Sequence, residues 1–172
     1  MTPQIRTIDE SHASDLAALR RAALIDSPES FLASPEDDWA SSDAAVRELL
    51  QRQPDSVVFG AYAPQLVGML GVYRQKQSKV AHKARLWGMF VLAPYRRQGL
   101  AVHLLEAAIQ YTRTLDGITS VHLSVSESAI GAQRLYESAG FKTWGIEPDA
   151  IRVGVRSQSE HHMYLALQVG TE

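Results

Sequence analysis

Hydrophobic residues recur along the chain with two different spacings, and each spacing predicts a different kind of element. A spacing of three to four residues, typical of one helix face, predicts four helices: residues 11–25, 36–52, 98 or 99 to 115, and 129–139. Alternation with period two, in β-branched and aromatic segments, predicts seven strands: residues 4–8, 56–63, 66–75, 86–92, 120–125, 141–146 and 161–168. Elements in this order predict an α/β (α+β) fold, with one central sheet and helices on both faces.

The third predicted helix has the most regular pattern, with an apolar face that continues over four turns. An Asp116–Gly117 pair predicts its end, and Gly140 occupies the position of a C-cap glycine after the fourth helix. The aromatic side chains of Trp87 and Trp144 are expected in the core.

Composition narrows the functional classes. The 172 residues correspond to a single domain, since a domain has about 100–200 residues, and the net charge of −2 gives no case for binding nucleic acid or an anionic membrane. Cysteine is absent, which excludes disulfides, cysteine-ligated metals and a catalytic thiolate. No secretory signal is recognised, and the longest apolar run, residues 67–73, is too short to cross a bilayer, so we expect a cytoplasmic protein.

A metal site is not expected either. His161 and His162 are adjacent histidines in a predicted strand. Neighbouring side chains in a strand point to opposite faces, so these two imidazoles cannot easily share one ion.

The segment from Met89 to Ala101 carries the clearest chemical signal. A strand ends there, the chain turns, and a helix begins at Gly99, preceded by Arg96 and Arg97. The first amides of a helix have no internal partner and lie at the positive end of the helix dipole, so they favour a phosphate. A glycine at that point lets the backbone approach a ligand closely, and the arginines add charge-assisted donors.

Two common phosphate motifs are absent, the GxxxxGK[ST] of P-loop proteins and the GxGxxG of dinucleotide-binding folds. Arg96-x-x-Gly99-x-Ala101 instead resembles the Q/R-x-x-G-x-G/A signature of the GNAT (GCN5-related) N-acetyltransferases. Leu135-Tyr136 followed by Gly140-Phe141 resembles that family's L-Y-x-x-x-G-F segment. The order of elements is also similar over almost the whole chain, which implies the GNAT-like fold, a central mixed, mostly antiparallel sheet of about seven strands flanked by four helices.

The resemblance implies roles for particular residues. Acetyl-CoA would be the acetyl donor, and its pantetheine arm would pair with the backbone of Met89, Phe90 and Val91. Tyr136 occupies the position of the general acid that protonates the departing thiolate, although the helical spacing alone favours a core tyrosine. The backbone amides that would cradle the pyrophosphate are those of Arg97, Gln98, Gly99, Leu100 and Ala101.

Two positions depart from the family pattern. Ala129 stands where many members have an asparagine that contacts the cofactor arm, and Ser124 stands where some have a glutamate on the base side. The sequence therefore does not determine which group is the general base. The candidates are His122, Glu127 or a chain of water molecules. We expect no single strong base among them.

The acceptor is expected to be a primary amine on a small molecule or a peptide. Phe31 and Trp39 lie near the loop that borders the acceptor site in this family, and they are candidate pocket walls. The resemblance implies direct attack of the amine on the thioester in a ternary complex. Three alternatives remain: a transferase for a longer acyl group, a non-catalytic acyl-CoA sensor, and a phosphate site that serves nucleotide binding alone. The chain is expected to be a monomer or a homodimer.

Overall fold

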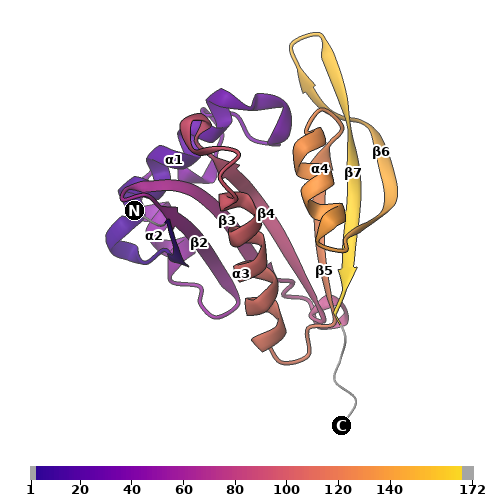
Figure 1. The fold of residues 1–172 in the computed structure, drawn as a ribbon, viewed down its shortest axis with the longest axis horizontal. Helices are drawn as coiled ribbons and strands as arrows, with labels where there is room; N and C mark the ends of the chain where they lie inside the picture. Colours follow the sequence, from indigo (N-terminus) through magenta and orange to yellow (C-terminus); the bar gives the residue numbers. More distant parts are fainter. Residues whose placement is uncertain (1–2, 168–172) are drawn as a thin grey trace.

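The computed structural model describes residues 3–167 and contains seven strands and four α-helices (Figure 1). The strands are β1 (Gln4–Thr7), β2 (Ser56–Tyr62), β3 (Leu66–Arg74), β4 (Lys83–Val91), β5 (Ser120–Ser126), β6 (Lys142–Val153) and β7 (Arg156–Ala166). The helices are α1 (Ala13–Asp26), α2 (Asp43–Leu50), α3 (Leu100–Thr114) and α4 (Ile130–Ser138). The final residue of the last predicted strand, Gln168, lies outside the described residues.

The seven strands form one sheet in the order β1-β2-β3-β4-β5-β7-β6. Only the β4–β5 pair is parallel, and the other five neighbouring pairs are antiparallel. Helices α1 and α2 pack on one face of the sheet in one apolar cluster, and α3 packs on the other face in a second cluster (Figure 1). The structure confirms the predicted mixed, mostly antiparallel sheet with helices on both faces.

The parallel pair β4–β5 is short because β4 bends away from β5. Residues Lys83–Arg85 pair with Ser120–His122, and beyond them the two strands diverge (Figure 1). In β4, Gly88 and Met89 lie together opposite Leu70 of β3, which is a β-bulge, and Gly88 has a left-handed φ of 69°. A bulge bends its strand and increases the local twist, so it accounts for the divergence.

The second helix is shorter than the predicted range of residues 36–52. The α-helix covers only Asp43–Leu50, and a separate 3-10 turn occupies Trp39–Ser41. The hydroxyl of Ser42 accepts a hydrogen bond from the Ala45 amide at 3.2 Å, so this serine caps the helix instead of lying inside it. Serine and aspartate side chains compete for backbone amides and favour caps over helix interiors.

The last two strands are longer than predicted. The sequence predicts them over residues 141–146 and 161–168, but β6 and β7 form a hairpin that also includes residues 147–153 and 156–160. A register irregularity between Glu147 and Ile151, with a left-handed φ of 54° at Asp149, interrupts the alternation that identifies a strand. The prediction of a core position for Trp144 was wrong, because its side chain lies on the edge strand β6 and is 64% exposed.

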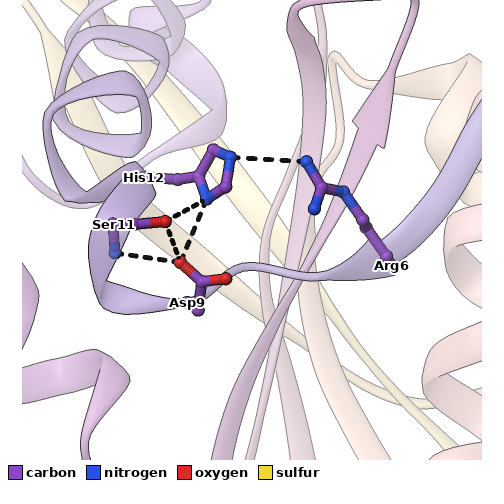
Figure 2. A network of polar contacts seen from close by, with 4 residues as sticks. All are labelled: Arg6, Asp9, Ser11 and His12. Atoms are coloured by element: carbon purple, nitrogen blue, oxygen red, sulfur yellow. Dashed lines mark hydrogen bonds and ion pairs between the residues drawn. The ribbon is translucent and has the colours of Figure 1, made fainter.

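An exposed polar network fixes the entry of the chain into α1 (Figure 2). The Asp9 carboxylate accepts hydrogen bonds from the amide and hydroxyl of Ser11, and the His12 ring lies within hydrogen-bond distance of Asp9 and of Arg6. These bonds lower the pKa of Asp9 to about 2, the Ser11 hydroxyl having the largest effect. The network caps the 3-10 turn that precedes α1.

A buried ion pair ties α1 to the segment that precedes α2. The Nε and Nη2 atoms of Arg20 donate to both carboxylate oxygens of Asp38 at 2.8–3.2 Å. Only 7% and 4% of these two side chains are exposed. The guanidinium also lies over the rings of Phe31 and Trp39, at 4.9 and 5.7 Å from their centroids. This pair therefore holds both predicted acceptor-pocket residues.

Asp38→Ala is expected to lower the free energy of unfolding by about 3 kcal/mol or more, because it leaves the Arg20 charge buried without a partner. Urea unfolding measures the loss. The neighbouring Asp37→Ala is the control, since Asp37 is exposed and only caps a turn through the Ser34 amide. A midpoint for Asp38→Ala equal to that of the control would contradict the assigned role.

Candidate active site

A cavity of about 800 Å³ occupies the gap between the diverging strands β4 and β5. We call it the wedge cavity. Its walls come from four segments: residues 26–31 after α1, residues 86–91 of β4, residues 123–126 of β5, and residues 128–132 with Leu135 and Tyr136 at α4. Arg96 and Ala101 complete it at the start of α3. The volume lies in the range of small-molecule and cofactor sites.

The start of α3 presents an uncapped helix N-terminus at the rim of this cavity. Gly99 is the N-cap residue, with a left-handed φ of 81°, and no side chain caps the first turn. The first helical hydrogen bond joins the His103 amide to the Gly99 carbonyl, so the amides of residues 100–102 remain available to a ligand. Two of the predicted phosphate-binding residues, Leu100 and Ala101, contribute these amides.

The two arginines of this turn differ in their surroundings. Arg96 donates from Nε to the Val91 carbonyl at 2.8 Å, and its Nη2 bonds Asp26 at the end of α1. It thereby joins the end of β4 to α1. Arg97 is exposed and has a left-handed φ of 61°, and it forms no salt bridge with any residue from 3 to 167. The neighbouring Gln98 donates from Nε2 to the Pro94 carbonyl at 3.2 Å, and neither side chain lines the wedge cavity.

The edge of β4 that faces the wedge cavity has no strand partner among residues 3–167. β5 leaves β4 after Arg85, whereas β4 continues to Val91. Met89, Phe90 and Val91, the residues predicted to pair with a pantetheine arm, all line the cavity. Unpaired strand edges are templates for pairing with an extended ligand, so the geometry suits that prediction.

Tyr136 lies on α4 with its ring buried against Phe141, and it reaches the wall of the wedge cavity. Burial alone raises the pKa of Tyr136 well above its usual value. The hydroxyl therefore stays protonated at neutral pH and can act as a hydrogen-bond or proton donor. Gly140 ends α4 as predicted, with a φ of 95° and with the Phe141 amide bonded to the Tyr136 carbonyl at 3.0 Å.

The two candidate bases lie outside the lining of the wedge cavity. Glu127 is exposed and accepts a hydrogen bond from the Ser159 amide at 2.8 Å, which ties the end of β5 to β7. His122 contacts the Ser120 hydroxyl at 2.9 Å and stacks on Tyr164. Burial, followed by the charges of Lys83 and Arg85, lowers the pKa of His122.

A hydrogen-bonded group that the sequence did not indicate lies beside the cavity. Ser124 of β5 lines the cavity and bonds His162 of β7, and His162 in turn bonds Glu147 of β6. Arg85 of β4 donates to the same Ser124 hydroxyl at 3.3 Å. The four residues lie far apart in the sequence, between positions 85 and 162, and only the register of the strands brings them together. No local spacing in the sequence indicates this group.

The two predicted acceptor-pocket residues line different cavities. Phe31 lines the wedge cavity, and Trp39 lines a second cavity of about 1160 Å³ beneath α2. Trp87 borders both cavities and meets the Trp39 ring edge-on at 5.3 Å. Of Phe31 and Trp39, only Phe31 lines the wedge cavity between the diverging strands β4 and β5.

Comparison with known proteins identifies the family. The acetyltransferase (GNAT) family matches residues 16–141, which is more than half of the chain. The chain belongs to the GNAT acetyltransferase family. Both sequence segments that resemble the family, Arg96–Ala101 and Leu135–Phe141, lie inside the matched range.

Solved structures confirm the GNAT fold. The chain is 19% identical to a GNAT-family acetyltransferase from Streptococcus pneumoniae, with a TM-score of 0.84, over 96% of this chain and 100% of that one. It is 16% identical to yncA from Salmonella typhimurium, solved with its cofactor acetyl-CoA, with a TM-score of 0.85 over 100% and 98%. NAA60 from Arabidopsis thaliana, solved with a bisubstrate analogue, gives 16% identity and a TM-score of 0.74 over 96% and 98%.

One curated relative also matches. Human N-acetyltransferase 8 is 33% identical over 81 residues, which make up 46% of this chain. The match spans about a third of that relative's length, 35%.

Two further findings describe the GNAT domain. No helix in the described part of the chain is long and apolar enough to span a bilayer. Among residues 3–167, no group of three or more histidine, aspartate or glutamate side chains is arranged to hold a metal ion.

Proposed function

We propose that this GNAT protein transfers an acetyl group from acetyl-CoA to a primary amine by direct attack in a ternary complex. The observation that carries the proposal is the wedge cavity. It is lined by Arg96 and Ala101 at the uncapped start of α3, by an unpaired strand edge and by a buried tyrosine. Family membership and the acetyl-CoA complex of yncA support the choice of donor.

Each wall of the cavity has one task in this proposal. The amides from Arg97 to Ala101 hold the pyrophosphate at the positive end of α3. The backbone of Met89, Phe90 and Val91 pairs with the pantetheine arm and polarises the thioester carbonyl, which stabilises the developing oxyanion. Acetyl-CoA supplies an activated acyl carbon, so no protein nucleophile is needed and a cysteine-free chain suffices.

Tyr136 donates to the sulfur as the carbon–sulfur bond breaks. The side chain is buried and neutral, and it reaches the cavity from α4 opposite β4. A hydroxyl held away from water interacts strongly with a developing thiolate. Phe31 and Trp87 form the wall of the wedge cavity on the acceptor side, and Trp39 packs behind Trp87. The Arg20 guanidinium lies over the rings of Phe31 and Trp39.

His122→Ala and Glu127→Gln are each expected to lower kcat/KM by less than about tenfold. Neither residue lines the wedge cavity, and Glu127 serves a backbone contact between strands. A proton-transfer residue contributes about 10²–10⁴-fold, so a loss of that size in either variant would refute the prediction. Rates measured from pH 6 to 10 give the comparison.

The activity is tested with acetyl-CoA and a panel of an amino acid, a polyamine, an alkylamine and a peptide with a free N-terminus. Release of CoA and the mass of each product are measured. We expect at least one amine to gain a single acetyl group. An acyl-CoA series of increasing chain length in competition with acetyl-CoA tests the preference for a longer acyl group.

The second candidate is a non-catalytic acyl-CoA sensor, which one observation favours. Ala129 is the N-cap residue of α4 and forms no side-chain cap, so the asparagine contact that many GNAT members make to the cofactor arm is missing here. Calorimetric binding of acetyl-CoA without acetylation of any amine in the panel would support this candidate over the enzyme.

A further inference from the structure

Three side chains on adjacent strands form a continuous hydrogen-bonded chain. The Ser124 hydroxyl lies 2.8 Å from Nδ1 of His162, and Nε2 of His162 lies 3.0 Å from Oε2 of Glu147. Ser124 and His162 are paired directly across β5 and β7, and Glu147 comes from β6 on the far side of β7. The strand register therefore places all three groups.

The partners at the two ends determine the direction of every bond. An ionised glutamate only accepts, so Nε2 of His162 carries the hydrogen and Nδ1 keeps its lone pair. Arginine only donates, so Arg85 occupies one acceptor position of the Ser124 oxygen, and the Ser124 hydrogen points to Nδ1. The Ser124 oxygen is left with one lone pair for a further donor.

The chain of bonds runs from the cavity to solvent. Ser124 lines the wedge cavity, the His162 side chain is 23% exposed, and Glu147 is 57% exposed. Asp9, Ser11 and His12 combine similar residue types, but they cap an exposed turn and lie outside the wedge cavity (Figure 2). Of these two groups, only the one that contains Ser124 joins the reaction site to water.

We propose that Ser124, His162 and Glu147 form a proton relay that removes a proton from the acceptor amine. The proposal rests on the acetyltransferase function proposed above. Ser124 accepts the N–H hydrogen of the entering amine while its own hydrogen passes to Nδ1 of His162. Glu147 holds the ring in the required tautomer and faces the imidazolium that forms. Ser124 contacts the amine, and His162 and Glu147 act through it.

The protons balance over one turnover. An amine that enters as ammonium loses one proton through Ser124 to His162, and His162 releases it to solvent. The nitrogen lone pair then forms the carbon–nitrogen bond, and the carbon–sulfur bond breaks as Tyr136 protonates the sulfur. The second N–H proton, released as the amide forms, restores Tyr136. The products are the amide, the CoA thiol and one proton.

Charged groups on three strands face His162. The carboxylates are those of Glu147 on β6, which bonds the ring, and Glu160 on β7, and the guanidinium is that of Arg85 on β4, which bonds the same Ser124 hydroxyl. His122 lies on the same sheet face two residues from Ser124 on β5. Burial has the largest effect on Glu160 and raises its pKa, whereas the nearby His162 acts to lower it. The His162 ring therefore lies among two acidic side chains and one guanidinium from neighbouring strands.

The first test compares the pH profiles of kcat/KM for wild type, Ser124→Ala, Ser124→Thr and His162→Asn, with the best amine of the panel. Near pH 7, Ser124→Ala and His162→Asn are expected to lose about 10²-fold, and Ser124→Thr is expected to keep most activity because it keeps the hydroxyl. The loss should shrink above about pH 10, where an aliphatic amine arrives already deprotonated. Binding of acetyl-CoA should not change.

The matched control is Ser120→Ala. It removes a serine–histidine contact of 2.9 Å on the same face of β5, but Ser120 does not line the wedge cavity. Its pH profile should match wild type. Profiles for the Ser124 and His162 variants that match this control would overturn the relay while wild-type acetylation still supports the enzyme. Failure of the wild type with every amine would overturn both proposals.

The second test needs no acceptor. Nitrogen NMR of the histidine rings reports which nitrogen carries the hydrogen, and the relay requires Nε2–H for His162. A Nδ1–H tautomer in the wild-type protein would overturn it. An acetyl group found covalently on Ser124 would assign the hydroxyl to nucleophilic attack and would also overturn the relay.

Discussion

Replacing Gly99 with aspartate is expected to weaken acetyl-CoA binding by about a thousandfold. The residue caps the start of α3, and an added carboxylate would stand next to the bound pyrophosphate. Two like charges about 4 Å apart repel by about 4 kcal/mol at the effective dielectric constant of a protein surface, which is nearly three powers of ten in affinity. Calorimetric titration with acetyl-CoA measures the loss.

The control for this variant is Gly99→Asn, which has the same size without the charge. Asparagine tolerates left-handed backbone better than most residues, and Gly99 has a φ of 81°. A Cβ atom added at Gly99 would meet only the His103 ring, at 3.7 Å, so space is not limiting. Gly99→Asn should therefore retain most of the affinity. Unchanged affinity in Gly99→Asp would show that the phosphates bind elsewhere.

Tyr136→Phe is expected to lower kcat by about 10²-fold and to leave the affinity for acetyl-CoA nearly unchanged. Phenylalanine keeps the ring that packs on Phe141, so the substitution removes the hydroxyl without creating a cavity. The departing sulfur then lacks its proton donor. Turnover and calorimetric affinity, measured on the same preparation, separate this effect from a change in binding.

Tyr111→Phe is the matched control. Tyr111 also has a pKa raised mainly by burial, but its hydroxyl donates to the Pro54 carbonyl at 2.7 Å, away from the wedge cavity. Loss of that hydroxyl should leave turnover intact. If Tyr136→Phe retains the turnover of Tyr111→Phe, Tyr136 is a core residue of α4 and the proton reaches the sulfur by another route.

The sequence predicted the parts of the fold that depend on local patterns. The helix period of α3, the C-cap glycine of α4 and the β-branched and aromatic runs of β2 and β3 each arise within one element, and the structure confirms these elements. The predicted alternation does not appear as alternating burial, because every residue of β2 is buried. The helix start at Gly99 could also be predicted, because a strand end followed by a glycine and a helical pattern is a local signal. The assignment of cofactor and catalytic roles to these residues stays a prediction.

The parts that sequence missed depend on register and irregularity. Gly88 and Met89 form the bulge that turns β4 from β5, and a glycine in a strand indicates a bulge only loosely. The irregular pairing near Asp149 hides the length of β6 from a pattern search. The sequence places Trp144 in the core because it is aromatic, but strand order puts β6 at the sheet edge, where Trp144 is exposed. In the sequence, His162 stands next to His161, but its hydrogen-bond partners are Ser124 on β5 and Glu147 on β6.

Following a labelled acetyl group is the clearest test of direct acetyl transfer from acetyl-CoA to the amine. Acetyl-CoA labelled in the acetyl group is mixed with the protein and the amine panel, quenched over one turnover, and separated into donor, protein and amine fractions. In direct transfer, the label passes from acetyl-CoA to the nitrogen of an amine and is never attached to the protein. Label that accumulates on the protein before it reaches the amine, or that reaches no amine at all, would contradict it.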